Sequence, residues 1–145
     1  MKIKKLTVCN KEFNYGHPTI SKDGKMMVIV TNESGKYQLL ELIRTKTNNW
    51  IKRSVIYSSL EESIILNPII IDNQTIYFSS NMKEGEGKFD IYKISKLNEK
   101  WQNPINMSAF NSIEDDLGIM FINHNSGYIS SNRFDKTDSI YYFEK

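Results

Sequence analysis

Short apolar runs alternate with short polar turns along the whole chain. The runs are four to eight residues long and rich in isoleucine, valine and aromatic side chains, while Asp, Asn, Gly and Ser fill the segments between them. Such runs are typical of β-strands, because β-branched and aromatic side chains pack well on a pleated, partly buried surface. We therefore predict strands and no helix, with the strands at residues 17–21, 26–31, 37–43, 50–56, 67–71, 74–80, 89–94, 101–107, 119–122, 128–131 and 139–143.

This strand pattern repeats about every fifty residues. An asparagine ends the second strand of each unit, at Asn32, Asn81 and Asn132, which gives spacings of 49 and 51 residues. Trp50 and Trp101, which begin the fourth strands, are 51 residues apart. A period near fifty residues, with several short strands in each unit, is the signature of β-propeller blades.

The repeat divides the single predicted domain, residues 1–145, into three units. We expect an all-β protein of three four-stranded antiparallel blades, at about residues 17–56, 67–107 and 117–143, with the first strand of each blade innermost. The third unit has three strands and no fourth. Residues 3–8 (IKKLTV) resemble the fourth strand of the first unit (IKRSVI), so a segment of this kind from a second chain is expected to complete the third blade.

Three phrases in these units resemble the TolB-like, or WD40-like, β-propeller repeat family. Ser79-Ser80-Asn81 followed by Asp90-Ile91-Tyr92 matches the family phrase in full. Partial matches are Thr31-Asn32 after an Asp-Gly turn, and Ser130-Ser131-Asn132 before Ser139-Ile140-Tyr141. The resemblance implies a non-catalytic protein-binding scaffold, because relatives are mostly bacterial envelope or periplasmic interaction platforms, often with six blades.

Three blades are half of a six-bladed ring, so a single chain cannot close such a ring alone. Closed propellers typically have four to eight blades, so two copies would supply a suitable number. We expect a homodimer in which residues 3–8 of one chain pair with residues 139–143 of the other and complete a six-bladed ring. The alternative is that the sequence belongs to a longer propeller.

Composition and charge exclude several other classes. The net charge is +2, and no stripe of Lys and Arg with interleaved aromatic residues is present, which argues against nucleic-acid binding. No apolar stretch is long enough to span a bilayer, and no signal-peptide core follows Met1. As written, the chain is expected in the cytoplasm, or in the periplasm or envelope if a leader has been removed. A single cysteine, Cys9, excludes an internal disulfide.

Acidic residues recur in the loops that precede the first strands. Together with the strand-ending asparagines they form the candidate binding surface, a rim face for an unknown protein partner: Glu12, Glu62, Glu114, Asp115, Asn32, Asn81 and Asn132. The alternative is structural. Loop acids often accept backbone N–H groups in their own loops, strand-ending asparagines can fix the strand end, and Asp90 can act as an acceptor between blades.

A second functional class is a carbohydrate-binding or glycoside-hydrolase-like propeller. Glycosidases need paired carboxylates in the channel, but the first strands here carry apolar residues. Sugar stacking would fall to Phe13, Tyr15 and Phe134. His17 and His124 do not have metal-ligand spacing, and no nucleophile elbow or phosphate loop is present. We therefore expect no enzyme activity, no cofactor and no metal.

Overall fold

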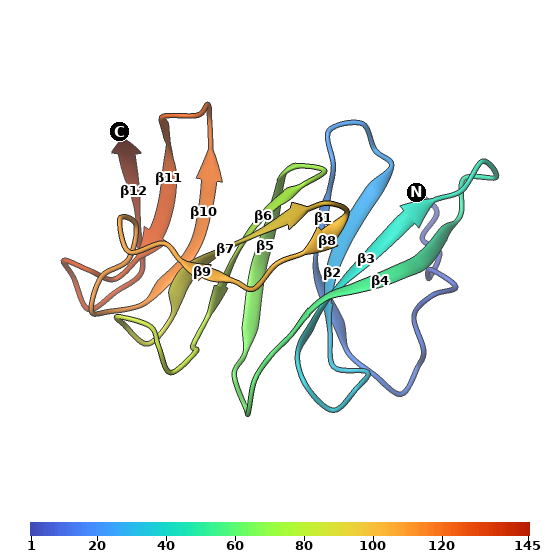
Figure 1. The fold of residues 1–145 in the computed structure, drawn as a ribbon, viewed down its shortest axis with the longest axis horizontal. Helices are drawn as coiled ribbons and strands as arrows, with labels where there is room; N and C mark the ends of the chain where they lie inside the picture. Colours follow the sequence, from blue (N-terminus) through green and yellow to red (C-terminus); the bar gives the residue numbers. More distant parts are fainter.

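The computed structural model describes residues 1–145 and is all-β. Its strands form three antiparallel sheets of four, five and three strands, which stand side by side in a row (Figure 1). The structure contains no helix that is long and apolar enough to cross a membrane. The expectation of an all-β chain is confirmed.

The first sheet is a simple meander. It contains β1 (Tyr15–Ile20), β2 (Met26–Thr31), β3 (Gln38–Arg44) and β4 (Trp50–Ser58), each paired antiparallel with the next. All of β2 except Met27 is buried, because both of its faces are covered. This agrees with the uninterrupted apolar run of the sequence.

The second sheet contains β5 (Ile65–Asp72), β6 (Thr75–Ser80), β7 (Asp90–Leu97), β8 (Lys100–Trp101) and β9 (Ile105–Asn106). Both β8 and β9 pair with β7. The single fourth strand predicted for residues 101–107 is therefore wrong, and two short pieces take its place. Pro104 lies between them, and its ring nitrogen has no hydrogen to donate to the ladder.

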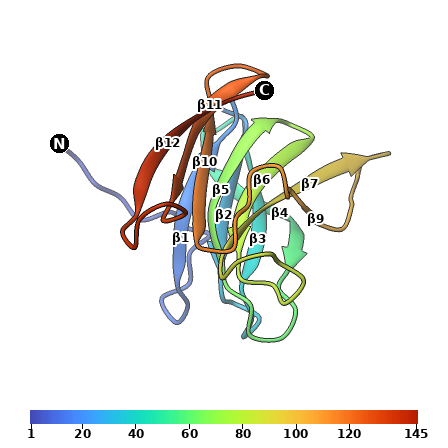
Figure 2. The ribbon, with the colours of Figure 1, turned by 90° about the vertical axis from the view of Figure 1, so that its left-hand side faces the viewer.

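The third sheet contains β10 (Asp116–Phe121), β11 (Ser126–Ser131) and β12 (Ser139–Glu144), and no fourth strand. Residues 3–8 do not form a strand within this chain. Figure 2 shows the N-terminal end leading away from the body of the sheets. Nearer to β1, the side chain of Val8 packs against the cluster of Ile29, Leu40 and Leu42 in the first sheet.

Two cores hold the row of sheets together, and β6 contributes to both. Alternate residues of a strand point to opposite faces of its sheet. Ile76 and Phe78 therefore enter the core shared with the first sheet, while Tyr77 enters the core shared with the third. The first strands of the three sheets are neighbours, since β5 contacts both β1 and β10.

Candidate functional site

The connections between strands gather on two opposite sides of the row. The loops that precede β1, β5 and β10 lie on the same side as the loops of residues 32–37, 81–89 and 132–138 (lower side in Figure 1). We call this side the loop face. The turns of residues 21–25, 73–74 and 122–125 lie on the opposite side, which we call the turn face.

The three strand-ending asparagines make the same hydrogen bond. In each sheet the side-chain oxygen accepts a backbone N–H from the loop that precedes the first strand of that sheet. The pairs are Asn32 with Asn14 at 2.9 Å, Asn81 with Ile64 at 2.6 Å, and Asn132 with Asp115 at 2.8 Å. These amide oxygens hold the loops in place, as the structural alternative predicts.

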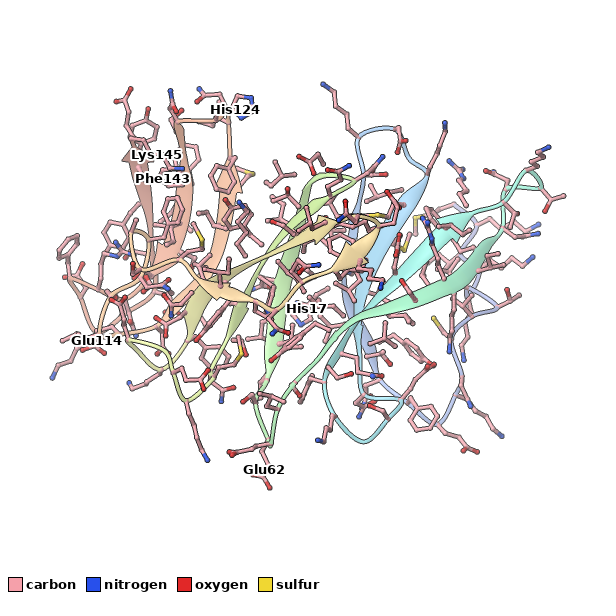
Figure 3. The ribbon with its side chains drawn as sticks, viewed as in Figure 1. His17, Glu62, Glu114, His124, Phe143 and Lys145 are labelled. Carbon is pink, nitrogen blue, oxygen red and sulfur yellow. The ribbon has the colours of Figure 1, made fainter.

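The acidic residues of the loop face differ in their surroundings. Glu12 and Glu62 are exposed, and neither carboxylate makes a hydrogen bond or an ion pair. Glu114 lies 3.9 Å from the Lys88 ammonium, and Asp115 accepts a hydrogen bond from Asn132. Figure 3 shows Glu62 and Glu114 on the loop face but far apart.

No group of three or more His, Cys, Asp or Glu side chains is close enough to hold a metal ion. The loop face therefore offers separate acidic side chains that a partner could contact, and no single acidic centre.

Asp116, which follows the predicted Glu114 and Asp115, is a buried acid on the loop face. Its side chain is fully buried, and it accepts hydrogen bonds from the backbone and hydroxyl of Ser112 at 2.7 and 3.0 Å. Arg133 forms an ion pair with it at 2.6 Å. This contact fastens the loop after β11 to the start of β10.

Asp90, at the start of β7, is a second buried carboxylate on this side. Its oxygens accept the backbone N–H of Gly87 at 3.2 and 3.3 Å. Gly87 has no space for a side chain, since a Cβ there would lie 2.0 Å from the carbonyl oxygen of Glu114. Burial raises the pKa of the Asp90 carboxyl, and the negative charge of Asp116 raises it further.

This raised pKa predicts how the Asp90→Asn variant behaves with pH. The folded state binds the Asp90 proton more tightly than the unfolded chain does, so the ionised carboxylate destabilises the fold. The contribution of Asp90 to stability is therefore largest below about pH 4, the ordinary range of Asp, and is lost as pH rises through the raised pKa. Asparagine can still accept the Gly87 N–H but carries no charge. We expect Asp90→Asn to be more stable than the unchanged protein at neutral pH, with the advantage vanishing in acid.

Urea unfolding across this pH range measures the effect. The exposed Asp138→Asn is the matched control and should change little at any pH. A loss of stability in Asp90→Asn that is equal at all pH values would contradict the prediction.

A groove along the first strands was not predicted. It has a volume of about 650 Å³ and is lined by residues of β1, β5, β10, β11 and β12. His17 and Asn67 occupy equivalent positions in β1 and β5, and both have left-handed backbone conformations, with φ of 50° and 47°. Each lies at an irregularity in strand pairing, which turns its side chain out of the regular ladder.

These two side chains form a row with β10. Asn67 Nδ2 donates to the carbonyl oxygen of Leu117, so the Asn67 side-chain oxygen faces His17 Nδ1 at 3.0 Å. His17 Nδ1 must then carry the hydrogen, which leaves Nε2 without a partner in this row. Residues 17, 67 and 117 are each fifty apart, and the His-Pro and Asn-Pro pairs at this spacing are the only sequence signal of the row.

Aromatic residues near the groove differ from those expected. Phe13, Tyr15 and Phe134 do not line it, whereas Tyr128 does. The Tyr15 hydroxyl donates instead to the Glu33 carboxylate. The groove contains no acidic side chain, so its polar side-chain groups are an imidazole, an amide and three hydroxyls. This set can donate and accept hydrogen bonds but lacks the paired carboxylates of glycoside hydrolysis.

A scan against protein-family models gives no match for this chain, and a search of curated proteins gives none.

Proposed function

We propose that the three sheets are blades of a TolB-like β-propeller and that a second copy of the chain completes a six-bladed ring. Two features support this proposal. The first strands lie next to one another, as inner strands of neighbouring blades do, and the asparagine hydrogen bond recurs in every sheet.

The observation that carries the proposal is the outer face of the third sheet, at the left end of the row in Figure 1. Four large side chains on this face are exposed: Met120 at 54%, Tyr128 at 40%, Ile140 at 69% and Tyr142 at 55%. They are neighbours across the strands. Contiguous apolar surface of this kind marks a protein-binding face. The outer edge of β12 is also unpaired, which leaves a strand edge open for addition.

The outer side of the first sheet, at the opposite end of the row, would meet this face. It carries the Ile29, Leu40 and Leu42 cluster, which is buried in the single chain with Val8 packed on it, and Val55, which is exposed at 48%. In a two-fold ring, the third sheet of one copy meets the first sheet of the other, and both junctions are equivalent. The segment of residues 3–8 then lies beside the partner's β12, where it can add the missing fourth strand.

The closed ring would act as a non-catalytic platform for a protein partner. The exposed and unpaired carboxylates of Glu12 and Glu62 support the loop face as the binding side, because a partner can contact them without breaking an internal ion pair. Met120, Tyr128 and Ile140 at one end of the groove belong to the junction in such a ring, and the part formed by β1 and β5 faces the central channel. This part has no acidic group, which favours binding over hydrolysis.

Light scattering during size-exclusion chromatography tests the assembly. The unchanged protein should have a mass near twice 16.9 kDa. Ile140→Asp should give a monomer, because it places a charge in the apolar junction. Deletion of residues 1–8 should also weaken the dimer.

Ile105→Asp is the matched control. Ile105 is a strand isoleucine exposed at 64%, but it lies on β9 at the outer edge of the second sheet, so this variant should remain dimeric. A monomer of the unchanged protein at micromolar concentration, or equal behaviour of the two aspartate variants, would rule the closed dimer out.

A further inference from the structure

A pocket between the second and third sheets opens on the turn face, on the side of the molecule opposite the loop face. Its volume of about 610 Å³ is within the range of small-molecule sites. Tyr77 and Phe121 provide aromatic surface, with ring centroids 5.0 Å apart. Ile71 and Ile122 also line the pocket and are exposed at 37% and 58%. The interior is therefore mainly apolar and accessible.

Basic side chains surround this apolar interior. Lys22, His124 and Lys145 line the pocket, and no acidic side chain does. None of the three forms an ion pair with a carboxylate. Figure 3 shows His124 and Lys145 toward the same end of the third sheet. The Lys145 ammonium lies 5.3 Å from the centre of the Phe110 ring.

A neutral donor completes this set. The Asn123 side-chain oxygen accepts the backbone N–H groups of Asn125 and Ser126, at 2.8 and 3.0 Å. These bonds fix the amide, and its Nδ2 group makes no hydrogen bond within the protein although Asn123 lines the pocket. An oriented N–H donor beside two lysine ammonium groups and an imidazole is suited to an anionic oxygen.

The gap between the first and second sheets on the same face shows that this character is not a general property of the repeat. That gap is smaller, about 220 Å³, and it is lined by three acidic and three basic residues: Asp23, Glu41, Glu99, Lys25, Arg53 and Lys96. Its formal charges balance, so it has no excess of positive charge to attract an anion. Only the second gap combines a large apolar interior with unpaired positive charge.

We propose that the pocket between the second and third sheets binds a small amphipathic carboxylate. The apolar or aryl tail lies against Tyr77 and Phe121, and the carboxylate lies among Lys22, His124 and the Asn123 amide. Free phosphate fits less well, because it has no tail to cover the apolar interior. Every lining residue belongs to one chain, so this site does not depend on closure of the ring.

Methyl NMR of the full chain with labelled isoleucines tests the site, with decanoate below its micelle-forming concentration as the probe. The signals of Ile71 and Ile122 should shift in a saturable manner. Those of Ile105 and Ile113, which are exposed at 64% and 80% outside the pocket, should not. Decanol is the control for the tail alone and should bind at least about tenfold more weakly, since it cannot form charged hydrogen bonds.

Two variants separate the contributions of charge and tail. Lys22→Gln combined with His124→Gln should weaken decanoate about tenfold or more and leave decanol unchanged. Ile122→Ser should weaken both. Lys36→Gln, on the loop face, should change neither. Equal affinity for decanol and decanoate, shifts spread over all isoleucines, or no shift at millimolar decanoate would overturn the proposal, whatever the oligomeric state.

Discussion

Replacing Glu41 with alanine should lower the free energy of unfolding by about 3–5 kcal/mol, the cost of breaking a buried ion pair from one side. Glu41 lies in β3, faces the second sheet and is only 1% exposed. Its carboxylate accepts a hydrogen bond from Ser54 at 2.7 Å and from the Trp101 indole at 3.4 Å. The Lys96 ammonium lies 3.8 Å away.

The size of this effect follows from what the substitution leaves behind. The Lys96 side chain is only 7% exposed and stacks over the Trp101 ring at 4.7 Å. Without Glu41 its positive charge stays in the junction between two sheets with no carboxylate beside it. The Trp101 N–H also loses its acceptor, and a buried donor without a partner is costly.

Urea unfolding measures the loss, and two further variants show its origin. Lys52→Ala removes the cation of the more exposed Glu33–Lys52 pair and leaves Glu33 to accept from Tyr15, and such pairs contribute about 0–1 kcal/mol. Glu41→Leu with Lys96→Met removes both buried charges and should recover most of the stability, because apolar replacement of a buried pair is often neutral. Arg53, the other cation beside Glu41 at 3.3 Å, has a side chain exposed at 50% and can be solvated by water. A loss below about 1 kcal/mol for Glu41→Ala would show that the network does not fasten the first two sheets.

The strands could be predicted where the local sequence alone indicates which residues are buried and where the chain turns. The run at residues 26–31 is apolar on both faces, and β2 has those same bounds. Turn residues such as Asp23-Gly24 end the neighbouring strands, and Gly24 has the positive φ of 70° that the turn needs. The fifty-residue period likewise predicted three groups of strands, which the structure shows as three sheets.

Edge strands could not be predicted with the same success. Whether an edge segment forms a strand depends on a partner as well as on its own composition. Residues 101–107 have a strand-like sequence, but Pro104 and the polar residues before it divide their pairing with β7 into two pieces. Residues 3–8 resemble β4 in sequence but have no neighbouring strand within the chain.

The side of the molecule on which the candidate residues lie could be predicted, but their hydrogen-bond partners could not. The sequence placed the asparagines and loop acids on one side, but the hydrogen bonds of Asn32, Asn81 and Asn132 reach loops that lie 17 or 18 residues earlier. Pattern alone does not show such pairing. The His17–Asn67 contact spans 50 residues and depends on left-handed backbone conformations that residue type does not reveal. Glu41 appeared only as one polar residue in an apolar strand, since its partner Trp101 is 60 residues away.

Replacing Arg133 with alanine should also lower the free energy of unfolding by about 3–5 kcal/mol, because Asp116 would stay buried without its cation. Arg133 Nη2 donates to the Asp116 carboxylate and to the carbonyl oxygen of Phe110, both at 2.6 Å. Asp90 is a second buried negative charge on the same side, and it interacts with Asp116. Loss of Arg133 therefore leaves the repulsion between these two carboxylates without the positive charge that offsets it.

Urea unfolding of three variants separates the charge of Arg133 from its packing. Arg133→Lys keeps a positive charge but loses the separate Nε donor, which bonds the Ser131 hydroxyl at 3.1 Å, so an intermediate loss is expected. Arg133→Ala combined with Asp116→Asn removes the unpaired charge while Ser112 can still donate to the new amide oxygen, and it should be more stable than Arg133→Ala alone. If the double variant is no more stable than Arg133→Ala, the stability comes from the packing of the Arg133 side chain on Tyr141, whose ring centre is 6.0 Å away, and not from the ion pair.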